Sequence, residues 1–120
     1  MTDIYSTEAD FEAEITILTS EQGGRNQPPC NYIRWDLGYA DRDHDDPIYM
    51  IWPNFLDAHG SPMSKDIPIE GTSIARMHIL VKDMLDFHKQ RLLVGTKFNC
   101  HEGCRVVAKG KVTKLLAISS

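Results

Sequence analysis

Apolar and polar residues alternate along several short stretches of this chain. Between Phe11 and Leu18 small or apolar residues alternate with glutamate and threonine. The same two-residue period returns over residues 75–82 and again over residues 105–118. Side chains of a β-strand point alternately to its two faces, so this period predicts strands with one buried and one wet face.

The alternation also predicts which residues share a face. The buried face of the first strand is expected to hold Phe11, Ala13, Ile15 and Ile17. Over residues 75–82 one face holds Met77, Ile79 and Val81, and the other holds Arg76, His78 and Lys82. The last strand places Val106, Ala108, Gly110 and Val112 on one face and Arg105, Val107, Lys109, Lys111 and Thr113 on the other.

Further strands are predicted over residues 30–37, 47–52 and 91–100, while residues 83–89 fit a helical turn or a loop. Residues 53–73 contain three prolines and two glycines, so we expect a long irregular connection there. Residues 1–9 are polar and are expected to form a flexible N-terminal arm, which leaves residues 10–120 as one domain.

Several short strands without a long helical pattern favour a closed antiparallel barrel or a sandwich. The length of 120 residues, 42% hydrophobic and 25% charged, is ordinary for one globular domain. No apolar run approaches the roughly 18 residues of a membrane span. Three cysteines and a start without a signal-peptide pattern predict a reducing, cytoplasmic location and no membrane partner.

Charge is divided unevenly along the chain, although the net charge is only -4. Residues 1–60 carry 3 basic and 12 acidic side chains, whereas residues 61–120 carry 10 basic and 5 acidic ones. Two outcomes are open. The second half can form a basic face on an acidic protein, or strands from both halves can interleave and mix the charges.

Motifs of known chemistry are mostly missing. There is no phosphate-binding loop for GTP and no dinucleotide fingerprint. Asp41, Asp43 and Asp45 resemble the start of a calcium loop, but its required glycine and glutamate are absent. The two thiols of Cys100 and Cys104 would lie on one side of an extended strand, beside the imidazole of His101.

With Cys30, that group leaves a zinc site or cysteine–histidine chemistry as minor alternatives. We therefore predict no catalytic residue, no metal and no cofactor, and expect a protein that is not an enzyme.

Two motifs at opposite ends of the chain resemble one known domain. The first comprises Phe11, Ala13, Glu14, Leu18, Glu21, Gly23, Gly24 and Arg25. The second comprises Phe98, Glu102, Gly103, Arg105, Val107, Gly110 and Val112. Together they resemble the first and last strands of the third, C-terminal domain of elongation factor Tu. That resemblance implies a six-stranded closed antiparallel β-barrel.

The resemblance also implies binding residues. In the full-length factor this domain packs on the GTPase domain, touches the T-stem backbone of aminoacyl-tRNA and receives the exchange factor. The corresponding RNA or partner contacts are Lys82, Glu102, Gly103 and Arg105, and the structural motif residues are Glu21, Gly23, Gly24, Arg25 and Gly110. A purely structural role is the alternative: glycines shape turns and packing, and arginines bridge to carboxylates.

The predicted function is a non-enzymatic binding module that recognises tRNA or another RNA backbone, or a translation-related protein. The rival hypothesis is a protein-interaction or regulatory domain without nucleic-acid binding. Such a domain could mimic the factor's barrel or form a homodimer through an exposed patch of Trp35, Trp52 and Phe55.

Overall fold

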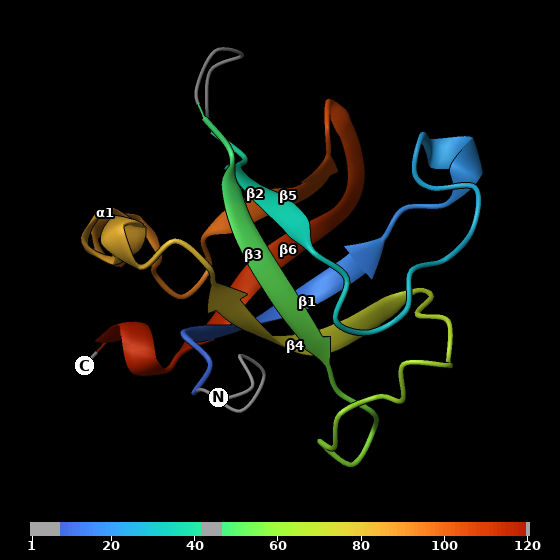
Figure 1. Cartoon of the computed structure of the whole chain (residues 1–120), viewed down its shortest axis with the longest axis horizontal. Helices are drawn as coiled ribbons and strands as arrows, with labels where there is room; N and C mark the ends of the chain where they lie inside the picture. Colours follow the sequence, from blue (N-terminus) through green and yellow to red (C-terminus); the bar gives the residue numbers. More distant parts are fainter. Residues whose placement is uncertain (1–7, 42–46, 120) are drawn as a thin grey trace.

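The chain folds into one closed barrel of six antiparallel strands (Figure 1). The computed structural model describes residues 8–41 and 47–119. The strands are β1 (Phe11–Ile17), β2 (Trp35–Tyr39), β3 (Tyr49–Phe55), β4 (Thr72–Ile79), β5 (Lys97–Glu102) and β6 (Arg105–Leu115). They close in the order β1-β4-β3-β2-β5-β6. The predicted all-β, six-stranded closed barrel is thereby confirmed.

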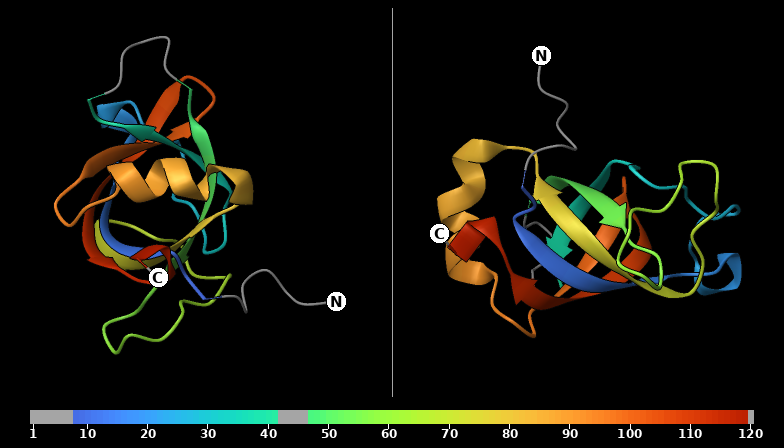
Figure 2. Two further views of the ribbon diagram at one scale, coloured as in Figure 1. Left: turned by 90° about the vertical axis from the view of Figure 1, so that its left-hand side faces the viewer. Right: turned by 90° about the horizontal axis from the view of Figure 1, so that it is seen from below.

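The two ends of the barrel differ. At one end the helix α1 (Leu85–Arg91) lies across the mouth, and we call this the helix end (Figure 2, left). The 3₁₀ helix η3 (Lys82–Met84) leads into it, and η4 (Ala117–Ser119) contacts it. At the opposite end lie the 3₁₀ helix η2 (Ser20–Gln22) and the turn between β5 and β6, and we call this the hairpin end.

Apolar side chains of all six strands fill the barrel. The predicted inward face of β1 is confirmed, since Phe11, Ala13 and Ile15 are completely buried. The ring of Phe11 meets the edge of Phe98 at a centroid distance of 5.9 Å. Edge-to-face contacts of this kind add to the apolar burial that stabilises the core.

The expected aromatic dimer patch is not formed. Trp35 and Phe55 are 1% and 0% exposed, and their rings pack against each other inside the barrel. Only Trp52 of the three keeps partial exposure, because it lies on the outer face of β3. A homodimer through these three residues is therefore contradicted.

A β-bulge changes the predicted faces of β6. Cys100 pairs with Ala108 but His101 pairs with Val106, so one residue of β6 is extra. The extra residue shifts the alternation, and Val107, predicted to face outward, is buried. Beyond the bulge the predicted alternation is right, with Lys109 and Lys111 exposed on the outer face.

Several predicted boundaries were wrong. Strand β2 begins at Trp35 rather than at residue 30, where Cys30 makes only an isolated bridge to Pro68. Strand β5 begins at Lys97 rather than at residue 91, because α1 and a turn occupy the intervening chain. Val81 lies beyond the end of β4 and is 37% exposed, contrary to the predicted buried face.

The long connection between β3 and β4 is held by one buried side chain. Asn31 donates from Nδ2 to the carbonyl of Met63 at 2.9 Å, and its Oδ1 accepts from the amide of Phe55 at 2.7 Å. These bonds join the connection to the end of β3. Residues 1–7 of the predicted arm lie outside the described residues, whereas Ala9 is buried.

Among the residues that the structure describes, no helix combines the length and the apolarity that crossing a membrane requires.

Candidate nucleic-acid interface

The four binding residues implied by the resemblance do not come together. Lys82 begins η3 at the helix end, where its Nζ lies 3.9 Å from a carboxylate oxygen of Asp10. Glu102, Gly103 and Arg105 form the turn between β5 and β6 at the hairpin end. In this antiparallel barrel, β4 ends and β5 begins at the helix end, whereas β5 ends at the hairpin end. Lys82, which follows β4, therefore lies at the far end of the barrel from the other three.

Glu102 is engaged in holding the hairpin end together. Its Oε2 accepts from Arg25 Nη1 at 2.5 Å and from Trp35 Nε1 at 2.9 Å. Arg25 also donates from Nε to the carbonyl of Gln27. The pair thus ties the loop after η2 to the β5–β6 hairpin. Arg25 bridges to a carboxylate, as the structural alternative predicted.

Two of the predicted glycines meet clear geometric requirements. Gly103 has φ +61°, a left-handed conformation that glycine adopts at the turn without a Cβ clash. At Gly110 the ring of Phe98 lies against the backbone, and a Cβ there would be 2.3 Å from the nearest ring atom. Gly110 therefore serves the packing of the barrel.

The other motif residues form the local structure of η2. Thr19 caps the helix: its hydroxyl accepts from the amide of Gln22, whose side chain accepts from the amide of Thr19. Such a capping box satisfies amides that the helix start leaves free. Gly23 ends η2, Gly24 donates its amide to the Thr19 carbonyl, and Glu21 is exposed in the first turn.

A groove separates η2 from the β5–β6 hairpin. It is lined by Leu18, Gln22, Gly23, Asn99, Arg105, Val106 and Lys109. Two of these side chains are cations and two are carboxamides, and none is a carboxylate. Arg105 and Lys109 are exposed, and neither makes an ion pair with any described residue. The groove therefore offers free donors to an anion.

Of the predicted binding residues, only Arg105 lines this groove. Lys109, Asn99 and Gln22 were not predicted as binding residues. The outward position of Lys109 in the alternating pattern was the one available signal for it. Gln22 comes from the opposite end of the sequence, and only the pairing of β1 with β6 brings its loop to the hairpin.

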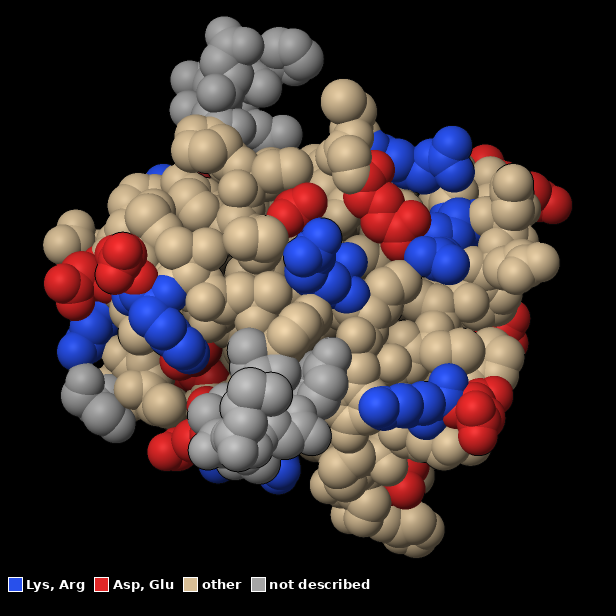
Figure 3. All heavy atoms as spheres, in the orientation of Figure 1, with Lys and Arg blue, Asp and Glu red and all other residues tan. Residues whose placement is uncertain are grey.

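Charges are mixed on the face that Figure 3 shows, which is the face with β3 in front. Basic and acidic side chains lie among one another there. The interleaving alternative thus describes that face, whereas the outer side of β6 carries a run of exposed cations, namely Arg105, Lys109, Lys111 and Lys114.

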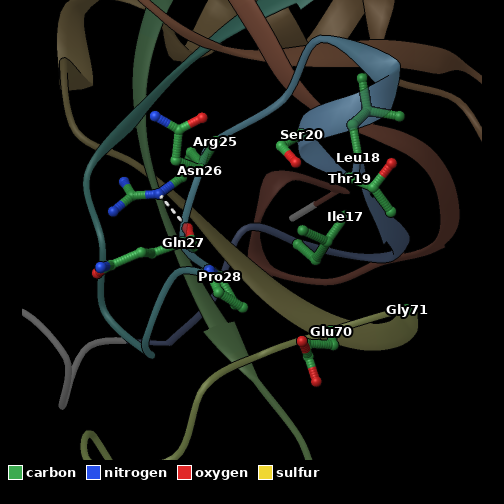
Figure 4. Close-up of a pocket in the computed structure, with 10 residues that line it drawn as sticks. All are labelled: Ile17, Leu18, Thr19, Ser20, Arg25, Asn26, Gln27, Pro28, Glu70 and Gly71. Atoms are coloured by element: carbon green, nitrogen blue, oxygen red, sulfur yellow. Dashed lines mark hydrogen bonds between the residues drawn. The ribbon is translucent and has the colours of Figure 1, made fainter.

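A second cavity, of about 230 Å³, lies on the other side of the η2 loop, between that loop and the start of β4 (Figure 4). Its arginine, Arg25, is already bound to the Gln27 carbonyl and to Glu102. The carboxylate of Glu70 also lines it. This cavity is less suited to an anion than the groove at Lys109.

The cysteines do not assemble as the alternative site required. Cys100 is completely buried in the core, whereas Cys104 is exposed in the turn, so the two do not share one side of a strand. Burial raises the pKa of the Cys100 thiol far above its usual range, which disfavours the nucleophilic thiolate.

Within residues 8–41 and 47–119 no three potential ligands form a metal-binding group. Of the aspartates compared with a calcium loop, Asp43 and Asp45 lie outside the described residues.

The chain matches no protein-family model and no curated protein.

Proposed function

We propose that this barrel is a non-enzymatic binding module that recognises the RNA backbone, tRNA included, through the groove beside the β5–β6 turn. One observation carries the proposal: the groove combines two unpaired cations, Arg105 and Lys109, with the carboxamides of Gln22 and Asn99, and no carboxylate lines it. A cytoplasmic location and a place in translation belong to the same proposal, through the resemblance of the end motifs.

The chemistry of the groove suits phosphate. Phosphate oxygens accept hydrogen bonds, and arginine, lysine and carboxamide groups donate them. None of the seven lining residues is aromatic, so the groove offers no surface on which unstacked bases would stack. We therefore expect contacts to the backbone of a structured RNA, with little dependence on its base sequence.

The proposal assigns different roles to the residues that the resemblance implied. Arg105 binds phosphate, and Gly103 shapes the turn that presents it. Glu102 is a positioning residue, because its carboxylate is occupied by Arg25 and Trp35. Lys82 is left out, since it lies at the helix end beside Asp10.

The test is a salt titration of tRNA binding. For the wild-type chain, log K should fall linearly with log salt concentration, because each phosphate contact releases a counterion. Arg105→Gln should lower the affinity and reduce the slope by about 1. Lys82→Gln removes the same charge at the helix end. It should change the affinity by no more than about twofold and leave the salt slope unchanged.

Two results would contradict this assignment. Absence of binding at the lowest salt concentration excludes RNA as the ligand. A loss with Lys82→Gln as large as that with Arg105→Gln excludes the groove as the site.

A protein partner is the second candidate, favoured by an exposed apolar surface at the helix end. Leu93 and Val94 follow α1 and are 60% and 66% exposed. Contiguous exposed apolar residues mark interaction surfaces. If this surface binds a protein, Leu93→Ser with Val94→Ser should abolish co-purification of that protein from lysate and leave RNA recovery unchanged. Recovery of the same protein with the double variant would exclude the surface.

A further inference from the structure

Two lysines stand directly opposite each other beyond the groove. On the outer face of the hairpin, Lys97 of β5 is paired in register with Lys111 of β6. Both are exposed. The next row towards the turn holds Asn99 and Lys109, which line the groove. The cations of the groove are thus continued along the same two strands.

This like-charge pair is unfavourable for the barrel by itself. Like charges directly opposite each other on neighbouring strands destabilise a sheet. No described carboxylate lies within ion-pair distance of either lysine, although Glu14 of β1 is the register partner of Lys111 on its other side. An anion bound across the two strands would remove the repulsion.

We propose that the RNA site extends along the hairpin as a track of four cations, Arg105, Lys109, Lys111 and Lys97, which we call the basic track. This inference rests on the proposed function and specifies its ligand further. Along β5 the rows of Arg105 and Lys111 lie at Glu102 and Lys97, five positions apart, which corresponds to about 17 Å of strand. At the B-DNA spacing of about 3.4 Å per nucleotide, the track spans on the order of five nucleotides.

The ends and borders of the track follow from its acidic neighbours. Beyond Lys97 a groove is lined by Arg91, Thr96 and Asp41, but Asp41 Oδ1 accepts from Arg91 Nη2 at 2.8 Å. That ion pair neutralises Arg91 and ends the track on the side of β5, while on β6 the next cation, Lys114, lies opposite Glu12. Glu14 borders it along β1. The ligand is therefore an RNA arm long enough to follow the hairpin, in contrast to a mononucleotide or a single phosphate.

The experiment compares two RNA hairpins with the wild-type chain and two double variants. One stem is too short to reach beyond Lys109, and the other is longer than the track. Lys97→Gln with Lys111→Gln should weaken binding of the long stem by about 10- to 100-fold near 0.1 M salt and reduce its salt slope by about 2. The same variant should leave the short stem within about twofold of wild type.

Arg105→Gln with Lys109→Gln should weaken both stems. Lys65→Gln, a neutralisation in the connection between β3 and β4, is the matched control and should weaken neither. Lys97→Gln alone should be at least as stable to heat as wild type, because it removes the like-charge pair and leaves Lys111 opposite Glu14; a lower melting temperature would contradict the repulsion on which the inference rests.

The outcomes separate the two proposals. If the Lys97/Lys111 variant binds the long stem as wild type does, the extended track is overturned while the groove stands. If it weakens both stems equally, the track is also overturned, since length would then be irrelevant. If neither stem binds the wild-type chain, the proposed function itself fails.

Discussion

Gly110 has no side chain, and this leaves space for the Phe98 ring inside the barrel. The Phe98 ring, 1% exposed, lies over the backbone of Gly110 in the paired position on β5. Three ring atoms lie between 2.3 and 2.8 Å from where a Cβ would be. The ring is enclosed by the core and cannot turn outward, so an added methyl group must displace it.

Gly110→Ala should therefore destabilise the protein by about 1–3 kcal/mol, the usual range for overpacking a core. Urea denaturation of both proteins measures this difference. Phe98→Leu replaces the ring with a smaller side chain. Adding Gly110→Ala to the Phe98→Leu variant should therefore cost less stability than adding it to wild type. A Gly110→Ala protein as stable as wild type would show that the ring has room to move.

The glycine itself was part of a recognisable motif, but its partner was not predictable. The spacing of Gly110 from Arg105 contributed to the resemblance, while the contact with Phe98 depends on the register of β5 against β6. That register includes the bulge near Val107, for which the alternating pattern gave no signal.

Among the elements, α1 depends on the barrel for its stability. Seven residues are too few for an isolated helix in water. Phe87 packs on Tyr49 with a centroid distance of 5.3 Å, and the Arg91 guanidinium lies 4.3 Å from the centre of the Tyr39 ring. His88 is 1% exposed, and its Nδ1 is 2.6 Å from the Tyr39 hydroxyl oxygen.

Burial lowers the pKa of His88 to about 4, because a charged imidazole would lose its hydration under the helix. Asp10 opposes this shift and Arg91 adds to it. Nε2 of His88 is buried without a hydrogen-bond partner among the described residues. The folded state therefore needs the neutral ring, whereas the unfolded chain binds the proton near pH 6.5.

The free energy of unfolding should thus be greatest above about pH 6.5 and fall as the pH decreases towards 4, by up to about 3 kcal/mol from this residue. His88→Gln removes the titration, so the stability difference between wild type and variant should shrink over that range. Denaturation at a series of pH values measures it. Parallel curves for the two proteins would exclude His88 as the source.

The elements were predictable to different degrees for physical reasons. Strand β1 has an uninterrupted period of two, and its buried face was predicted correctly. The helix α1 was left open between a helical turn and a loop, because seven residues give fewer than two full periods of a helix. The predicted strand over residues 91–100 was wrong in its first six residues, where apolar Leu92 packs into the core from a loop.

For the whole molecule, closure of the sheet decides which residues can act together. The fold class was predictable, since repeated short strands and the two end motifs both implied a barrel. The grouping of the site residues was not. Lys82 and Arg105 were expected in one binding region, but antiparallel strands carry them to opposite ends, while Gln22 and Lys109 meet across the groove.

The distribution of charge is likewise a property of the closed barrel. The basic second half of the sequence contributes β5 and β6, which are neighbours, so their cations collect on one face. Strands of the first half border this pair on both sides, β1 next to β6 and β2 next to β5. This arrangement supports an anion site on a chain whose net charge is negative.

The position of β1 between β4 and β6 has a consequence for how the protein is made. Strand β1 pairs with β6, with Phe11 opposite Leu115, so this seam can form only after residues 11–115 have left the ribosome. Until then β1 and β5 each present an unpaired edge to other chains. Pairing between strands so far apart in sequence also slows folding. Chaperones that shield nascent strands are therefore most needed during this interval.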